Sequence, residues 1–366
     1  MRISLLTYST RPRGGVVHTL HLAEALADLG HDVHVHSLGR GGDSSFFRTV
    51  DPAVHLHLHP FPDREGESVG DRITRSIEVL AASIDTTGHD VVHAQDCISA
   101  NAVADCIRTV HHVDHFTTPQ LIACHDRAIR RPYAHICVSQ AVADELAEDW
   151  GVSAAVIPNG VDAGRFEAAA SDDPRAAAAR ARWRERIGRP FVLVVGGIEP
   201  RKGTIDLAEA MARVRSLRPD VQLVVAGGET LFDYRDYRDE FDRLCDESGI
   251  DPIVLGMVDD DELPALVASC DVFAFPSIHE GFGLAPMEAL AAGRPLVCRH
   301  LPVLREVFDG AAVFASGVDD LSAAIIDALE AGVRPERQRF GIELARRHRW
   351  SDVARRHVDL YTSLAT

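Results

Sequence analysis

Residues 271–288 read Asp-Val-Phe-Ala-Phe-Pro-Ser-Ile-His-Glu-Gly-Phe-Gly-Leu-Ala-Pro-Met-Glu. The apolar run at 271–275 predicts a buried strand, and the Ala- and Leu-containing run at 284–292 predicts a helix with Pro286 in its first turn. A strand that passes through a glycine-rich turn into a helix is the repeating step of α/β folds. This stretch therefore predicts a parallel sheet covered by helices.

Two glutamates flank the turn. Glu280 lies in the turn itself, and we place Glu288 in the first turn of the helix, where the helix dipole favours a carboxylate. Ligands of open α/β sheets bind at the carboxyl ends of the strands, where a helix N-terminus favours phosphate. The backbone amides of Phe282, Gly283 and Leu284 are expected to face such phosphates. Carboxylates repel phosphates unless they contact hydroxyl groups, so the stretch predicts a ligand that carries both, such as a nucleotide sugar.

Strands and helices alternate on both sides of this stretch, which predicts two doubly wound halves. The expected strands are 3–9, 31–38, 54–58, 90–94, 107–111, 134–138 and a short one at 156–162, then 191–197, 221–226, 253–255, 271–275, 295–298 and 312–315. The first expected helix ends at Leu29. The others span 69–84, 98–105, 140–150, 204–217, 235–247, 261–268, 284–292, 303–308, 320–331 and about 351–363. Residues 163–189 are rich in Ala and Arg, which predicts a connector with a solvated helix.

The amino-acid composition limits the classes of function that the protein can have. The formal charge of −17 argues against nucleic-acid binding, which needs a basic surface. No run of 18 or more apolar residues occurs, and the N-terminus is interpreted as a first strand rather than a signal peptide. The seven cysteines are scattered without a C-x-x-C pair, which favours buried thiols over disulfides or zinc sites. We therefore expect a cytoplasmic protein.

Glycine-rich loops follow the first strand of each half. Gly14-Gly15 would let a ligand approach the backbone at a helix N-terminus, although a tight turn without a ligand explains the pair equally well. The loop from Gly196 to Gly203 matches neither the P-loop nor the dinucleotide pattern G-x-G-x-x-G. It carries two cations, Arg201 and Lys202, that could neutralise a diphosphate leaving group, with a solvated charged loop as the competing interpretation.

Histidines recur at alternate positions in two predicted strands, at 34 and 36 and again at 55, 57 and 59. Without matching carboxylates or cysteines, a half-exposed strand face is favoured over a metal site. His111 and His112 differ, because they follow a strand end, where reacting groups lie. The acidic run 259–262 resembles a metal ligand set but is interpreted as a helix N-cap with dipole-matched acids.

These motifs together resemble the GT-B-fold retaining glycosyltransferases of the large group that contains sucrose synthases, the mycothiol glycosyltransferase and phosphatidylinositol mannosyltransferases. The resemblance covers essentially the whole chain. It rests on Gly14-Gly15, Gly30-His31, Val138-Ser139, Ile157-Pro-Asn-Gly-Val-Asp162, Lys202-Gly203, and above all on Glu280-Gly-Phe-Gly with Glu288.

The resemblance implies two Rossmann-like domains that face a central cleft. The N-terminal domain (1–164) would bind the acceptor, and the C-terminal domain (165–349, with 165–190 as linker) would bind the nucleotide sugar. The helix within 350–366 would return to the N-terminal domain. No cofactor or metal would be required, and the donor would be a nucleotide-diphosphate sugar. The acceptor would be a small molecule, a lipid or a glycan, which leaves peripheral membrane contact open.

The resemblance also assigns roles to individual residues. Glu288 would bind the ribose, Glu280 the donor sugar and Lys202 the diphosphate. His111 matches the N-domain histidine near the donor sugar, with His112 as the alternative register.

One departure concerns Gly197, where family members commonly carry an arginine that contacts the diphosphate. Arg201 in the same loop is expected to replace it. A nucleotide-sugar 2-epimerase and a non-catalytic sugar-nucleotide-binding protein are the alternative functions. Neither the donor, which depends on a loop such as 230–238, nor the acceptor, whose contacts are expected around 93–96, is identified by the sequence.

Overall fold

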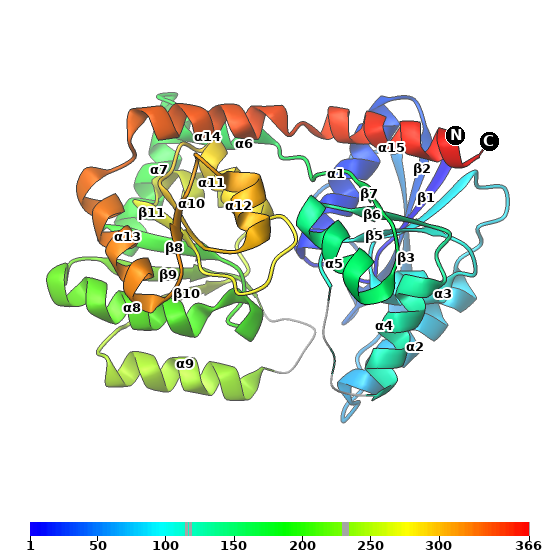
Figure 1. Ribbon diagram of the computed structural model, residues 1–366, viewed down its shortest axis with the longest axis horizontal. Coiled ribbons are helices and arrows are strands. Elements are labelled where there is room, and N and C mark those ends of the chain that lie inside the picture. The colour runs from blue at the N-terminus through cyan, green and yellow to red at the C-terminus, as the bar shows by residue number, and fades with distance from the viewer. Residues whose placement is uncertain (114–115, 117–118, 229–233, 366) are drawn as a thin grey trace. The chain divides into compact units, whose positions relative to one another are not determined.

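The computed structural model describes residues 1–113, 116, 119–228 and 234–365. The chain forms two compact units, one made of Met1–Gly160 with Trp350–Thr366 and the other of Val161–Arg349 (Figure 1). Among the described residues, no helix is long and apolar enough to cross a membrane.

The first unit contains a seven-stranded parallel sheet in the order β3-β2-β1-β4-β5-β6-β7. Its strands are β1 (Arg2–Leu6), β2 (Asp32–Arg40), β3 (Val54–Phe61), β4 (Val91–Ala94), β5 (Ile107–Val110), β6 (Ala134–Cys137) and β7 (Ala155–Val156). Its helices are α1 (Gly14–Asp28), α2 (Val69–Ser83), α3 (Cys97–Ala102), α4 (Pro119–Arg130), α5 (Gln140–Trp150) and α15 (Trp350–Leu364). The order reverses beside β1, the switch point at which such sheets bind ligands.

Helix α15 belongs to this unit because its apolar face packs against α1 (Figure 1). Trp350 is buried, and a Cβ atom added at Gly160 would lie 2.5 Å from its Cδ2. The hydroxyl of Tyr361, also buried, lies 2.7 Å from Nδ1 of His93 on β4. A buried hydroxyl needs such a partner, so this hydrogen bond fixes the register of α15 on the unit.

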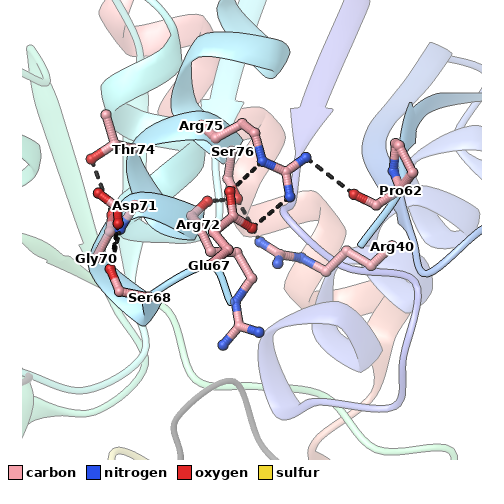
Figure 2. Close-up of polar contacts among 10 residues, drawn as sticks. All are labelled: Arg40, Pro62, Glu67, Ser68, Gly70, Asp71, Arg72, Thr74, Arg75 and Ser76. Carbon is pink, nitrogen blue, oxygen red and sulfur yellow. Dashed lines mark hydrogen bonds and ion pairs between the residues drawn. The ribbon is translucent and has the colours of Figure 1, made fainter. Parts of the chain in front are cut away.

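A polar cluster ties α2 to the end of β3 (Figure 2). Arg75 donates two hydrogen bonds of 2.6 Å to the carboxylate of Glu67 and a third, of 3.2 Å, to the carbonyl of Pro62. Its guanidinium lies 3.8 Å from the ring centroid of Phe61, a cation–π contact. Ser68 caps α2 by accepting a hydrogen bond from the Asp71 amide. The cluster therefore holds the 62–68 loop at the carboxyl edge of the sheet.

The second unit contains a six-stranded parallel sheet in the order β10-β9-β8-β11-β12-β13. Its strands are β8 (Phe191–Val195), β9 (Gln222–Ala226), β10 (Ile253–Gly256), β11 (Val272–Phe275), β12 (Leu296–Arg299) and β13 (Val313–Ala315). Its helices are α6 (Ala163–Ala170), α7 (Pro174–Ile187), the 3₁₀ helix η1 (Pro200–Lys202), α8 (Thr204–Leu217), α9 (Arg235–Glu247), α10 (Leu263–Ser269), α11 (Leu284–Ala291), α12 (Pro302–Phe308), α13 (Val318–Ala331) and α14 (Pro335–Arg347).

The predicted α/β class and its parallel sheets are confirmed, since every expected strand is present. Helices α4, α6 and α14 were not predicted. Glu262, the last residue of the acidic run 259–262, is the N-cap residue of α10 as predicted, but its side chain makes no cap hydrogen bond. The acidic side chains contact neighbouring helices: Asp260 pairs with Arg165 of α6, and Glu262 accepts a 3.1 Å hydrogen bond from Trp183 of α7. The connector helix α7 is therefore not solvated all round, because Trp183 is buried against α10.

Candidate active site

Two loops of the second unit meet at the carboxyl ends of β8 and β11. The first runs from β8 through η1 into α8, and Gly203, at φ 62°, makes the turn between η1 and α8. A Cβ atom at Gly203 would lie 2.4 Å from the carbonyl oxygen of Pro276 in the second loop. The Ile278 amide also donates a 2.9 Å hydrogen bond to the carbonyl of Arg201. Only glycine allows this close approach, which locks the two loops together.

The second loop ends at Gly283, which is the N-cap of α11 at φ 98° and provides no side-chain cap. The amides of the first turn, beginning at Leu284, thus depend on other acceptors, as a phosphate site requires. Phe282 is buried and packs edge-on against His348, with the ring centroids 5.6 Å apart. Because the helix begins at Leu284, the placement of Glu288 in its first turn is wrong: Glu288 lies in the second turn, and the helix has no acidic residue in its first.

The predicted cations and Glu280 form one cluster across the two loops. The Oε1 atom of Glu280 accepts hydrogen bonds from Arg201 Nη1 at 2.8 Å, from Lys202 Nζ, and from Ser277 Oγ at 3.2 Å. Arg201 also pairs with Glu199 at 3.1 Å. The Glu280 side chain is only 10% exposed, so this carboxylate is held by the two cations expected to bind a diphosphate.

Lys202 lies in a confined position. Its side chain is 14% exposed, and its Nζ lies 5.0 Å from the Phe275 ring centroid. A Cβ atom at Gly196 would come within 3.3 Å of the lysine stem. Burial lowers the pKa of Lys202 below its usual value, while Glu280 opposes the shift.

A compositional signal for Lys202 was missed in the sequence. It is the only lysine among the 38 basic residues of the chain, all others being arginine. A chain that uses arginine at every other basic position retains lysine here. This supports a need for a compact ammonium rather than for positive charge alone.

The electrostatic surroundings of Glu288 differ from those of the cluster formed by Glu280, Arg201 and Lys202. Burial raises the pKa of its carboxyl to about 7, with a further rise from Asp260 and Asp162 and a partial opposing effect of Arg165. A carboxyl with this pKa changes charge near neutral pH, so its hydrogen-bonding capacity towards a diol depends on pH. Residues 230–233 of the loop expected to select the donor lie outside the described residues.

In the first unit, the structure brings the predicted glycine pair and His111 together. Helix α1 begins at Gly14, and a Cβ atom at Gly15 would lie 3.4 Å from Cδ2 of His111. Burial lowers the pKa of His111 to about 3, so the ring is neutral at physiological pH. Its Nε2 and both amide atoms of Gln95 have no hydrogen-bond partner in the described part of the chain. These buried polar atoms at the ends of β4 and β5 are therefore suited to bind a ligand.

Comparison with known proteins identifies the family. Residues 177–347 match "Glycosyl transferases group 1", and residues 12–165 match "Glycosyltransferase Family 4". The MMP α-(1→4)-mannosyltransferase of Mycolicibacterium hassiacum is 30% identical over 434 residues, covering 99% of this chain and 98% of the relative. The phosphatidyl-myo-inositol mannosyltransferase of Mycobacterium tuberculosis is 30% identical, covering 100% and 97%.

Among solved structures, sucrose-phosphate synthase from Thermosynechococcus elongatus superimposes with a TM-score of 0.80 at 20% identity, covering 100% of this chain and 99% of that one. At this identity the similarity shows the fold, and it confirms the predicted GT-B class. The full-length sequence relatives confirm the predicted family. The chain belongs to the group 1 glycosyltransferases.

Proposed function

We propose that the protein transfers a sugar from a nucleotide-diphosphate sugar to an acceptor hydroxyl, with retention of anomeric configuration and without a metal ion. The observation that carries this proposal is the joint position of Lys202, Arg201 and Glu280 at the carboxyl ends of β8 and β11, beside the uncapped N-terminus of α11. These groups supply two cations and free amides for a diphosphate and a carboxylate for sugar hydroxyls.

The contacts of Glu280 favour an exchange of partners on donor binding. Glu280 neutralises Lys202 and Arg201. A diphosphate that contacts both cations would take over this charge, and Glu280 would then accept hydrogen bonds from the donor sugar. The cations are thereby held in place before the donor arrives, which lowers the reorganisation needed to stabilise the leaving group. Arg201 fills the role of the arginine that is absent at Gly197.

Front-face displacement accounts for retention with these residues. The bond from the anomeric carbon to the diphosphate oxygen breaks while the acceptor oxygen bonds to the same face of that carbon. The acceptor proton passes to the departing diphosphate, so no protein nucleophile is needed. Lys202 and the α11 amides stabilise the charge that develops on the diphosphate. His111, as a neutral ring, is proposed to contact the donor sugar by hydrogen bonding.

The sequence relatives support mannose as the first donor sugar to test, because both are named mannosyltransferases. A thermal-shift panel of UDP-, GDP- and ADP-linked mannose and glucose identifies the donor, since a ligand that binds the native state raises its stability. The acceptor, a small molecule, lipid or glycan, is then sought with that donor.

Transfer or slow donor hydrolysis by the wild type, at an unchanged rate in EDTA, is the expected result. Glu280→Gln should fold normally and lose most of this activity. Full activity in Glu280→Gln would refute the site, and donor binding without turnover would support a non-catalytic binding protein. Conversion of the donor to its 2-epimer would establish an epimerase instead.

A further inference from the structure

The alternating histidines of β2 and β3 lie on one face of the first unit. The two strands are parallel, and their register pairs His34 with His55 and His36 with His57. The rings stack along the strands, with centroids 4.7 Å apart for His34 and His55 and 4.4 Å for His36 and His57. The sequence interpretation set a metal site aside because no matching carboxylate was apparent. The structure supplies one, because Asp32 opens β2 beside these rings.

The Oδ1 atom of Asp32 lies 3.1 Å from Nε2 of His34 and 3.4 Å from Nε2 of His55. The candidate ligand atoms of the three residues all lie within 4.8 Å of one another. Ligands of a tetrahedral ion bound at about 2.0–2.1 Å are separated by roughly 3.3 Å. Two of the three separations thus match a metal site, and the third, between His34 and His55, is at most 4.8 Å.

One tautomer of His34, with the proton on Nδ1, satisfies its contacts with both Arg2 and His57. Arg2 Nε contacts Nε2 of His34 at 3.3 Å, and an arginine can only donate, so in this tautomer Nε2 carries the lone pair. The proton is then on Nδ1, which donates to Nε2 of His57 at 2.9 Å. A metal-binding histidine has this arrangement: one nitrogen is free for the ion, and the other donates to a neighbour that orients the ring.

In this tautomer a lone pair of His34 faces a carboxylate oxygen of Asp32 at 3.1 Å, an arrangement that a cation between the two atoms stabilises; in the other tautomer Nε2 donates to that oxygen. Arg2 supplies positive charge at this position, since its guanidinium is also 3.4 Å from Asp32. The arginine side chain is 45% exposed and can move away. The side chains of Asp32 and His55 are 49% and 56% exposed, which leaves a path for an ion and room for a water ligand.

We propose that Asp32, His34 and His55 form a binding site for a divalent first-row transition metal such as Zn²⁺, with His57 as a positioning residue. Two imidazoles and a carboxylate suit this class of ion better than Ca²⁺ or Mg²⁺, which prefer oxygen ligands. The site joins β2 to the edge strand β3, so the ion stabilises the sheet. It lies at the amino ends of these strands, whereas Gly15 and His111 follow the carboxyl ends of β1 and β5. The ion therefore takes no part in sugar transfer.

Calorimetric titration of the untagged, metal-free chain with Zn²⁺ tests the proposal. One ion per chain is expected to bind and to raise the melting temperature. Asp32→Asn and His55→Ala alter half-exposed side chains and should each weaken binding at least tenfold. Arg2→Ala should strengthen binding because it removes the competing cation. The matched control, His300→Ala, removes an exposed histidine of the other unit and should leave binding unchanged.

Absence of binding in the wild type, or equal affinity in Asp32→Asn and His55→Ala with normal circular dichroism, would overturn the proposal. Equal weakening by His300→Ala would do so as well, because it would indicate general histidine binding. Donor binding measured in EDTA reports separately on the proposed transferase function, so the failure of one proposal leaves the other standing.

Discussion

Replacing Lys202 by methionine tests how the cluster acts in catalysis. Methionine keeps most of the stem that lies against Gly196 and Phe275 but removes the ammonium. Glu280 retains Arg201 and Ser277 as partners, so it is not left as an uncompensated buried charge. We expect unfolding to become easier by about 1.5–3 kcal/mol, the value of one hydrogen bond between charged groups.

The expected effect of Lys202→Met on turnover is larger than its effect on folding. Loss of one preorganised donor to a developing anion costs about 2.7–4 kcal/mol in the transition state, or about 10²–10³ in kcat. Lys202→Arg keeps the charge, but its broader guanidinium does not fit a site in which only 14% of the lysine side chain is exposed. We expect this variant to lose at least tenfold in kcat.

Initial rates over a range of donor concentrations give kcat and KM, and urea unfolding gives the stability of each variant. Arg218→Met is the matched control, because Arg218 pairs with Asp220 at the surface of the same unit and should not affect turnover. A folded Lys202→Met variant with kcat within threefold of the wild type would show that turnover does not need the ammonium group. So would full activity in Lys202→Arg, since positive charge alone would then suffice.

Three further predictions follow from the buried groups. With a pKa of about 7, Glu288 is ionised in about one tenth of molecules at pH 6 and in about nine tenths at pH 8, so donor affinity should rise about tenfold between these pH values. Glu288→Gln should bind the donor weakly at both pH values, and an equal pH dependence in this variant would contradict the ribose assignment. Tyr361→Phe should lower stability by about 1–3 kcal/mol in urea unfolding, because it leaves the buried Nδ1 of His93 without its hydrogen-bond partner. An unchanged stability would show that this hydrogen bond does not hold α15 in place. Burial lowers the pKa of His111 to about 3 and of His357 to about 4, so below pH 6.5 these two histidines bind protons in the unfolded chain but not in the folded chain. The free energy of unfolding should therefore fall by up to about 1.4 kcal/mol per histidine per pH unit from pH 6 to 5, and a stability that does not change with pH would contradict their burial as neutral rings.

The strands could be predicted because parallel strands buried on both faces are continuous apolar runs, as Phe191–Val195 is. Helix α4 could not, because its sequence, PQLIACHDRAIR, mixes polar and apolar residues and buries only His125, Ala128 and Ile129 among the described residues. Its existence depends on the sheet it covers. The helix that begins at residue 284 was predicted, but Glu288 was wrongly included in its first turn. The start of the helix is set by the backbone conformation of Gly283, which the sequence pattern does not define to the residue.

The site was predictable residue by residue but not as an arrangement. Glu280 and Lys202 are 78 residues apart, and their contact depends on which strand ends lie side by side. The order of the sheet, with β8 beside β11, decides this, and no local pattern encodes it. The same holds for Asp32 and His55, which meet only because β2 and β3 pair in parallel at one register. The only lysine of the chain was visible in the sequence, and its uniqueness was the signal that a count of residue types would have revealed.

The proposed reaction is the transfer of a sugar from a nucleotide sugar with retention of anomeric configuration. Once the donor panel has identified the sugar, the most direct measurement is the NMR one-bond carbon–proton coupling at the anomeric carbon of the first-formed product. We expect the same anomeric configuration as in the donor. The opposite configuration in the first-formed product would contradict it.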